Sequence, residues 1–199
     1  MAKAFSAKPR ALRCSRCGRF ADWSEARLQV ICGCRPYIEL PPVLTREASA
    51  GEREAALDLF RRDFGRVRIV AFGEAVLLAE VPGLIVAEME GEISGALAWR
   101  RAGDAVQVIA LAADPMWQRS GVGGHLLAEA ELVARREAVD RVVVSATNDN
   151  LPALYFYQRR GYRLTEIVRG GGHEAAAPVT TGFADIPVLD ELRLEKTLK

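Results

Sequence analysis

The sequence lacks a long apolar run, a large net charge of either sign, and cysteine outside one short stretch. No segment reaches the roughly 18–20 uninterrupted apolar residues that a membrane-spanning helix needs. The start, Met1 to Arg10, is basic but is not followed by the apolar core of a signal peptide, so we expect a cytoplasmic protein without membrane contact. Its 27 basic and 26 acidic residues argue against disorder and against a chain that coats nucleic acid along its whole length.

The balanced charge conceals an uneven distribution. Residues 1–40 hold eight Lys and Arg against three Asp and Glu, whereas residues 41–199 are mildly acidic. Pro36, Pro41 and Pro42 stiffen the chain where this composition changes. At 199 residues the chain is long enough for one domain of ordinary size and an appendage. We therefore predict a small basic module over 1–40 and a second domain over 41–199.

All four cysteines belong to the basic module, at Cys14, Cys17, Cys32 and Cys34. Thiols this close together in a reducing compartment are explained more readily by a metal than by the alternatives, a pair of disulfides or free thiols. Two short turns that each carry two thiolates supply the tetrahedral ligand set of Zn²⁺. We predict a structural zinc site similar to a small zinc ribbon, with Cys-x-Cys in place of the more usual Cys-x2-Cys at the second turn. About 40 residues cannot bury enough apolar surface to fold unaided, so the metal would hold the module together.

Basic and aromatic residues surround these cysteines. They are Arg10, Arg13, Arg16, Arg19, Arg27 and Arg35, with Phe20, Trp23 and Tyr37 between them. Such a composition suits contact with a phosphate backbone or an exposed base. The alternative is that the aromatic residues form a miniature core and the arginines its solvated face, which we favour because no separate nucleic-acid signature is present. Nucleic acid or protein stays a candidate partner of the module.

The second domain changes from helical to strand periodicity and back along its length. A short strand over 43–46 and a helix over 50–64 are followed by five β-rich runs, at 67–72, 75–80, 84–89, 93–101 and 106–112. The pattern then predicts a helix over 123–138, a strand over 141–146, a helix over 151–160, a strand over 162–168, a surface loop and a last strand over 187–195. This order predicts an α/β (α+β) fold with a mixed, mostly antiparallel sheet flanked by helices, and a cofactor crevice where the sheet changes character.

The run from Leu111 to Leu127 carries the clearest chemistry. A predicted strand ends in the loop Gln118-Arg-Ser-Gly-Val-Gly-Gly124, which opens directly into a helix. The unpaired N–H groups of a first helical turn and the positive end of its dipole bind anions, and glycines let phosphate oxygens approach the backbone. We therefore predict a diphosphate cradle. The lysine and hydroxyl of a P-loop are missing and Gly-x-Gly-x-x-Gly does not directly follow the strand, which argues against nucleoside triphosphatases and dinucleotide-binding enzymes.

Two motifs together resemble the GNAT superfamily of N-acetyltransferases. The first, Gln118-Arg-Ser-Gly-Val-Gly123, is similar to the family's (Gln/Arg)-x-x-Gly-x-(Gly/Ala). The second, Asn150-Leu-Pro-Ala-Leu-Tyr-Phe-Tyr-Gln-Arg-Arg-Gly-Tyr162, is similar to Asn-x-x-Ala-x-x-Phe-Tyr-x-(Lys/Arg)-x-Gly-(Phe/Tyr). The likeness covers roughly residues 43–198 and leaves the cysteine module outside.

The resemblance implies an N-acetyltransferase that moves an acetyl group from acetyl-CoA to the amine of an unidentified small molecule or protein by direct attack. The pantetheine arm would pair with the backbone of Leu111, Ala112 and Ala113. The diphosphate would rest on the loop formed by Gln118, Arg119, Ser120, Gly121, Val122, Gly123 and Gly124. Asn150 would bind the pantetheine or its adjoining backbone, and Tyr157 would protonate the departing CoA thiolate.

The general base is not assigned. Many members of the family place a glutamate on the strand that corresponds to 106–113, and this sequence has none there. The candidates are Glu88, Asp149, Asp190 and Glu191, each expected to be a solvated carboxylate. The missing acid leaves an alternative function open, a zinc-ribbon module for RNA, ribosome or protein fused to a CoA-binding GNAT domain without catalysis. The intact glycine loop, Asn150 and Tyr157 favour the enzyme.

Overall fold

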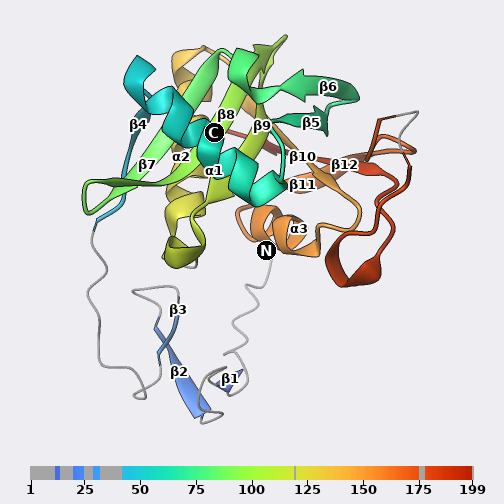
Figure 1. The fold of residues 1–199 in the computed structure, drawn as a ribbon. Helices are drawn as coiled ribbons and strands as arrows, with labels where there is room; N and C mark the ends of the chain where they lie inside the picture. The colour runs from blue at the N-terminus through green and yellow to red at the C-terminus, as the bar shows by residue number, and fades with distance from the viewer. Residues whose placement is uncertain are drawn as a thin grey trace, which may run out of the picture. The chain divides into compact units, whose positions relative to one another are not determined.

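A computed structural model divides the chain between Leu40 and Pro41 into two units (Figure 1). It describes residues 42–118, 120–174 and 178–198, and three strands of the first unit by their backbone: β1 (Leu12–Arg13), β2 (Phe20–Ser24) and β3 (Gln29–Ile31). β2 pairs antiparallel with both β1 and β3. The four cysteines and Arg119, and with them the predicted zinc site, lie outside the described residues.

A seven-stranded sheet forms the centre of the second unit (Figure 1). Its order is β11-β12-β10-β9-β8-β7-β4, and every neighbouring pair is antiparallel except β9 and β10. The strands are β4 (Leu44–Glu47), β7 (Gly83–Met89), β8 (Glu92–Ala102), β9 (Ala105–Ala113), β10 (Arg141–Thr147), β11 (Arg163–Val168) and β12 (Glu191–Thr197). The predicted mixed, mostly antiparallel sheet is confirmed.

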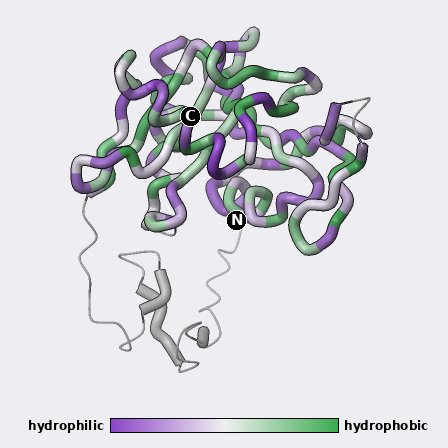
Figure 2. The backbone as a smooth tube through the Cα atoms, in the orientation of Figure 1, coloured by the Kyte–Doolittle hydropathy of each residue, from purple (hydrophilic) through white to green (hydrophobic). Residues whose placement is uncertain are grey.

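Helices cover both faces of this sheet. The strands alternate between two buried clusters: Ile85 and Ala87 of β7 belong to one cluster and Val86 to the other. The helix α1 (Arg53–Phe64) packs into the Val86 cluster, and α2 (Val122–Arg136) packs into the opposite one together with residues of α3 (Leu151–Gln158). In α2 the buried apolar residues recur at spacings of three and four, which explains why one face of this helix turns to the sheet. Figure 2 shows much of the hydrophobic chain in these central elements.

Between α1 and β7 the chain forms a hairpin of β5 (Arg68–Ala71) and β6 (Glu74–Leu77). The predicted strand over 75–80 ends early because residues Leu78–Glu80 form a 3-10 turn that buries Leu78. No helix in the part of the chain that the structure describes is both long and apolar enough to span a membrane.

The predicted last strand, 187–195, is wrong at both ends because β12 spans Glu191–Thr197. The Asn148 side chain forms hydrogen bonds with the backbone of the residues that precede β12. Its amide donates to the carbonyl of Pro187 at 2.9 Å, and its oxygen accepts from the N–H groups of Leu189 and Asp190 at 2.8 and 2.9 Å. These backbone groups are therefore satisfied by a side chain and form no ladder.

Candidate active site

β9 and β10 part midway along their length. Their parallel pairing runs from Ala105 opposite Arg141 to Val108 opposite Val144 and stops there. Beyond this point β9 pairs only with β8, and β10 only with β12. The register between β8 and β9 shifts at the same level, from Ala98 opposite Ala110 to Trp99 opposite Val108, which makes Ile109 the extra residue of a β-bulge. Beyond the bulge, the facing backbone edges of β9 and β10 therefore have no strand partner among the described residues.

Near the end of β9, alternate residues point their backbone N–H and C=O groups toward β10. The N–H of Asp114 donates to the carbonyl of Ser94 at 2.9 Å, so Asp114 and, by alternation, Ala112 direct their backbone groups to β8. Leu111 and Ala113 direct theirs to the opposite side. Of the three residues predicted to pair with a pantetheine arm, the geometry thus makes Leu111 and Ala113 available and turns Ala112 away.

The predicted anion loop connects β9 to α2. A 3-10 turn, Pro115–Trp117, follows β9, and the N–H of Ser120 donates to the carbonyl of Trp117 at 3.1 Å. Gly121 then adopts a φ of +96°, a left-handed conformation that favours glycine. This turn brings the chain directly into the first residue of α2.

The N-terminus of α2 has neither a side-chain cap nor an acidic residue in its first turn. The first N–H groups of a helix have no acceptor within it, which here applies to Val122, Gly123 and Gly124. Because nothing in this turn carries negative charge, the positive end of the dipole is not neutralised by the helix itself. The arrangement suits an anion such as a phosphate.

Phe156 of α3 and Arg160, which follows the helix, pack against the two glycines of this turn. A Cβ on Gly123 would lie 3.2 Å from the ring of Phe156, and a Cβ on Gly124 would lie 2.7 Å from Nη2 of Arg160. A side chain on Gly123 would therefore crowd the Phe156 ring, and one on Gly124 would displace the end of the Arg160 side chain. The Arg160 guanidinium lies over the Phe156 ring, 3.8 Å from its centroid.

Asn150 is the N-cap of α3. Its side-chain oxygen accepts the N–H of Ala153 at 3.1 Å, which explains the residue type locally. Its side-chain amide donates to no other described residue and is free to bind a ligand.

Tyr157 lies one residue further along α3 than Phe156 and is buried, with only 7% of its surface exposed. Its ring centroid lies 5.2 Å from that of Phe156 and 5.9 Å from that of Tyr162. Burial raises the pKa of Tyr157 to about 12, so the phenol keeps its proton throughout the physiological range. The hydroxyl makes no hydrogen bond to another described residue, and it is not among the enclosed polar atoms that lack a partner.

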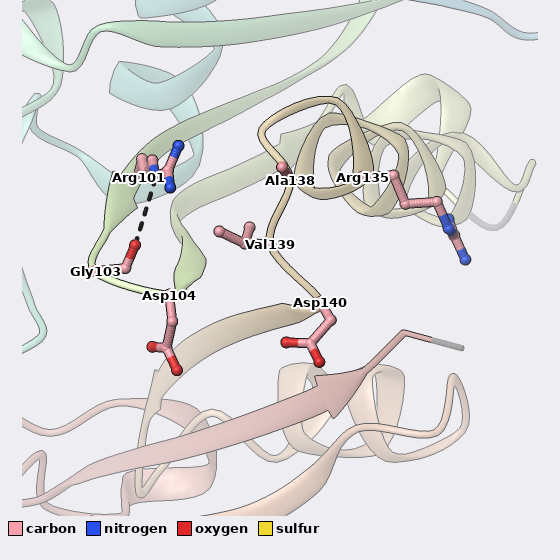
Figure 3. Close-up of a pocket in the computed structure, with 7 residues that line it drawn as sticks. All are labelled: Arg101, Gly103, Asp104, Arg135, Ala138, Val139 and Asp140. Atoms are coloured by element: carbon pink, nitrogen blue, oxygen red, sulfur yellow. Dashed lines mark hydrogen bonds between the residues drawn. The ribbon is translucent and has the colours of Figure 1, made fainter.

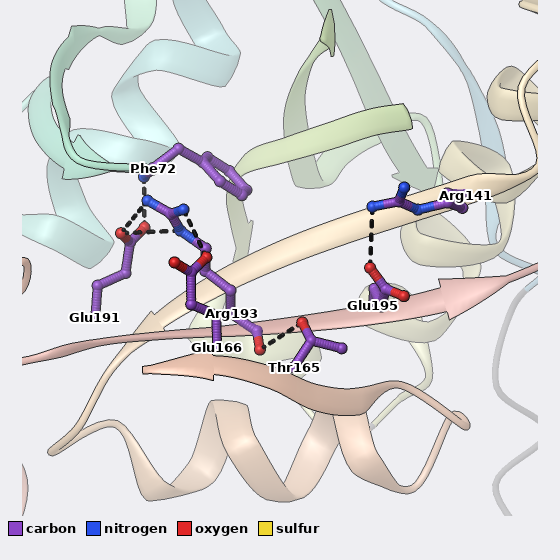
Figure 4. A network of polar contacts seen from close by, with 7 residues as sticks. All are labelled: Phe72, Arg141, Thr165, Glu166, Glu191, Arg193 and Glu195. Carbon is purple, nitrogen blue, oxygen red and sulfur yellow. Dashed lines mark hydrogen bonds and ion pairs between the residues drawn. The ribbon is translucent and has the colours of Figure 1, made fainter. Parts of the chain in front are cut away.

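Glu191 is buried and held by the protein, contrary to the expectation of a solvated carboxylate. It accepts the N–H of Phe72 from the β5–β6 hairpin and pairs with Arg193 at 3.0 Å (Figure 4). Arg193 also pairs with Glu166 of β11 at 2.8 Å. This network joins the hairpin to β11 and β12. The Glu191 carboxylate is therefore engaged in structural contacts and is a poor candidate for the general base.

The other three candidate bases, Glu88, Asp149 and Asp190, differ in the partners that their carboxylates bind. Glu88 pairs with an arginine of β4 at 2.7 Å, and Asp190 accepts a backbone N–H at 2.9 Å. Asp149 is buried, again contrary to expectation, and its Oδ2 accepts the N–H of Phe183 at 3.1 Å. Its Oδ1 has no partner among the described residues. No group of three or more His, Cys, Asp or Glu in the described part of the chain could hold a metal ion.

Two surface cavities flank β9. The larger, about 630 Å³, lies between the β8–β9 turn and the end of α2 (Figure 3), and its lining residues are Arg101, Gly103, Asp104, Arg135, Ala138, Val139 and Asp140. It adjoins the start of β9, away from the bulge and the glycine loop. The smaller, about 340 Å³, lies between Leu59 to Asp63 of α1 and the end of β9 at Ala113 to Met116. Burial raises the pKa of Asp63 there.

Two features of this region are absent from the sequence prediction. The bulge at Ile109 leaves no mark in the sequence, because residues 108–113 are all apolar. Arg160 occupies a variable position of the second motif, and only its approach to Gly124 in space distinguishes it from other surface arginines.

The sequence profile of the Acetyltransferase (GNAT) family matches residues 50–162. The chain is 31% identical over 144 residues to the uncharacterized protein YxbD of Bacillus subtilis strain 168, which covers 70% of this chain and 89% of that protein. It is 29% identical over 110 residues to YdhI of the same strain, covering 55% and 68%. The chain belongs to the GNAT acetyltransferase family.

Solved structures share the fold. The IAA acetyltransferase from Bacillus cereus superposes with a TM-score of 0.62 at 18% identity over 79% of this chain and 100% of that one. A GNAT family acetyltransferase from Elizabethkingia anophelis with acetyl-CoA bound gives 0.62 at 20% identity, covering 78% and 98%. A Bacillus subtilis acetyltransferase in complex with CoA gives 0.59 at 17% identity, covering 80% and 99%. At these identities the likeness establishes the fold alone.

Proposed function

We propose that this protein is an acetyl-CoA-dependent N-acetyltransferase that acts on an amine by direct attack. The observation that carries the proposal is the parting of β9 and β10 at the Ile109 bulge beside the uncapped N-terminus of α2, in a chain of the GNAT family. Two structurally similar proteins were solved with acetyl-CoA or CoA bound, which supports acetyl-CoA as the cosubstrate.

In this proposal the pantetheine arm lies between β9 and β10 as an additional strand. The backbone groups of Leu111 and Ala113 pair with its amides because they face this side unpartnered. The free side-chain amide of Asn150 donates to the same arm. The diphosphate rests on the amides of Val122, Gly123 and Gly124, with Gln118, Arg119, Ser120 and Gly121 forming the loop that brings the chain to them.

The reaction joins the amine nitrogen to the thioester carbon and breaks the C–S bond. Backbone N–H groups of β9 that face the ligand stabilise the oxyanion. Tyr157 keeps its proton until the thiolate forms and then protonates the sulfur. The proton that the attacking nitrogen loses restores the phenol, so the enzyme returns to its starting state. A CoA thiol and an N-acetyl product leave.

The test is thiol release from acetyl-CoA by the full chain with a panel of amines, peptides with free N-termini and lysine peptides. We expect release that depends on one class of amine and on enzyme concentration. CoA affinity without turnover on any amine would favour the non-catalytic alternative, and no CoA affinity would contradict the proposal as a whole.

We further propose that Cys14, Cys17, Cys32 and Cys34 bind one structural Zn²⁺. β1 and β3 both run antiparallel to β2, so both strands finish at the same end of the small sheet. In the sequence, Cys14 directly follows β1 and Cys32 directly follows β3. Four thiolates suit Zn²⁺, whose role here is to staple the module. Elemental analysis of the reduced full chain should give about one zinc per chain, and replacing Cys14 and Cys17 by Ser should remove it. Well below one zinc in the reduced wild-type chain contradicts the site.

A further inference from the structure

Arg160 differs from other described arginines without an ion pair, such as Arg66 and Arg135, because it is half-buried and its guanidinium stacks on an aromatic ring. Arg61, Arg136 and Arg193 each pair with a carboxylate. No Asp or Glu in the described part of the chain forms an ion pair with Arg160. Its Nη1 donates to the carbonyl of Phe156 at 3.2 Å, and its guanidinium stacks on the Phe156 ring at 3.8 Å. The plane of the guanidinium is thus fixed without its charge being neutralised.

The free edge of this guanidinium lies against the first turn of α2. A Cβ on Gly124 would lie 2.7 Å from its Nη2 and 3.4 Å from its Nε, so both groups border the Gly124 backbone. Nε and Nη2 form one of the two-pronged edges with which arginine binds phosphate oxygens. The N–H groups of the same helical turn have no acceptor within the helix. The Arg160 guanidinium and the backbone N–H groups therefore both offer hydrogen-bond donors at the first turn of α2.

Arg160 is only partly exposed, and its charge is opposed by its surroundings. Burial, followed by the neighbouring charge of Arg159, lowers the pKa of Arg160. A partly desolvated cation without a counter-charge is destabilised until an anion approaches it. The contact with the Phe156 carbonyl also offers a purely structural role, that of capping the C-terminus of α3. Anion binding and capping of α3 differ in their effect on ligand affinity, because only the first would make the affinity depend on Arg160.

We propose that Arg160 binds the diphosphate of acetyl-CoA, together with the first-turn amides of α2. The inference rests on the proposed function and adds to it a residue outside the glycine loop. Stacking on Phe156 orders the guanidinium before the ligand arrives, which reduces the entropy lost on binding. Arg160 is therefore a binding residue whose loss acts on the affinity for acetyl-CoA and leaves the proton transfer at Tyr157 intact.

The experiment compares Arg160→Gln with Arg159→Gln in the full chain. Arg159 is the matched control because it is adjacent and carries the same charge, yet it is exposed and donates to the hydroxyl of Tyr155 at 2.8 Å. Each variant is titrated with CoA and with dephospho-CoA, which keeps the diphosphate and lacks the 3′-phosphate. We expect Arg160→Gln to weaken both ligands alike by about tenfold to a hundredfold, the range of a charge-assisted hydrogen bond, and Arg159→Gln to weaken them less than about threefold.

Each other outcome overturns the inference. A loss with CoA but not with dephospho-CoA would assign Arg160 to the 3′-phosphate. Equal losses in both variants would indicate the long-range field of the two arginines. Unchanged affinity in Arg160→Gln would leave only the structural role. A wild-type chain that binds neither ligand would contradict the proposed function itself, a result distinct from these three.

A second variant covers the case in which Arg160→Gln does not fold. Arg160→Lys keeps the charge and loses the two-pronged edge, so we expect the affinities for CoA and dephospho-CoA to fall together by about three- to tenfold. Full affinity in Arg160→Lys would overturn the two-pronged contact. Thermal unfolding midpoints of all variants report whether the α3 cap matters for stability.

Discussion

The N–H of Asp114 donates to the carbonyl of Ser94 at 2.9 Å, and this hydrogen bond sets the direction in which the end of β9 faces. Because backbone groups alternate along a strand, Leu111 and Ala113 present theirs to the space beside β10. The parallel pairing with β10 has already ended at Val108 and Val144. An extended ligand with amide groups can therefore complete the sheet at this point.

Replacing Tyr157 by Phe removes the proposed acid and keeps the buried ring. We expect the turnover number to fall by about 10²- to 10³-fold, the range typical of a positioned general acid, and the dissociation constant of CoA to stay within about twofold. Steady-state kinetics with a competent amine and a CoA titration measure the two quantities separately. An unchanged turnover number would remove Tyr157 from the mechanism.

The same side chain makes the stability depend on pH at high pH. Burial raises the pKa of Tyr157 to about 12 in the folded protein, against about 10 in the unfolded chain. Between these values unfolding releases a proton, so the stabilisation is complete below pH 10 and is lost as the pH rises through about 12. A difference of two pKa units corresponds to roughly 2–3 kcal/mol.

Urea unfolding of the wild type and of Tyr157→Phe between pH 8 and 11.5 tests whether Tyr157 causes this loss of stability at high pH. We expect the wild-type free energy of unfolding to decline more steeply above pH 10 than that of the variant. Burial and Glu131 also raise the pKa of Tyr162, so a smaller decline persists in the variant. Parallel curves would show that Tyr157 is not protected from titration.

Asn150 has a local role and a proposed ligand role that substitution can separate. Asn150→Asp keeps an oxygen that accepts the Ala153 N–H and loses the amide donor, so we expect stability within about 0.5 kcal/mol of wild type and a loss of at least about fivefold in acetyl-CoA affinity. Asn150→Ala loses both and should also cost about 1 kcal/mol of stability. Wild-type affinity in the aspartate variant would leave Asn150 with the capping role alone.

Gly121 is required by its backbone conformation at a φ of +96°. A Cβ there would meet only ordinary contacts, so Gly121→Ala acts through strain, which we expect to cost about 1–2 kcal/mol and to weaken CoA binding by moving the loop. Gly91 is the matched control, because it has a φ of +84°, has open space around it and lies in the turn between β7 and β8. Gly91→Ala should cost similar stability and leave CoA affinity unchanged. Equal effects of both variants on CoA binding would contradict a specific role of the loop.

Much of the fold follows from local pattern. The helix over Val122–Arg136 has its apolar residues at spacings of three and four, and the antiparallel runs before it are separated by short turns, so the sequence predicts both. The two motifs are contiguous and carry their own spacing, so the glycine loop, Asn150 and Tyr157 are also found from the sequence.

The rest depends on contacts between distant segments. The bulge at Ile109 results from the register of β8 against β9, which the alternation of either strand does not encode. Residues 187–190 are predicted as the start of the last strand, yet Asn148 binds their backbone from about forty residues away and they lie outside β12. The carboxylate of the buried Asp149 likewise has its partner in a distant segment, since it accepts the backbone N–H of Phe183 from 34 residues on. Such pairings require the folded chain.

The most direct test of the central claim is a crystal structure of the full chain with CoA bound. The account predicts the pantetheine arm between β9 and β10, hydrogen-bonded to the backbone of Leu111 and Ala113, with the diphosphate on the first turn of α2. CoA bound elsewhere, for example in the cavity between Arg101 and Asp140, or an arm paired with Ala112 instead, would contradict it.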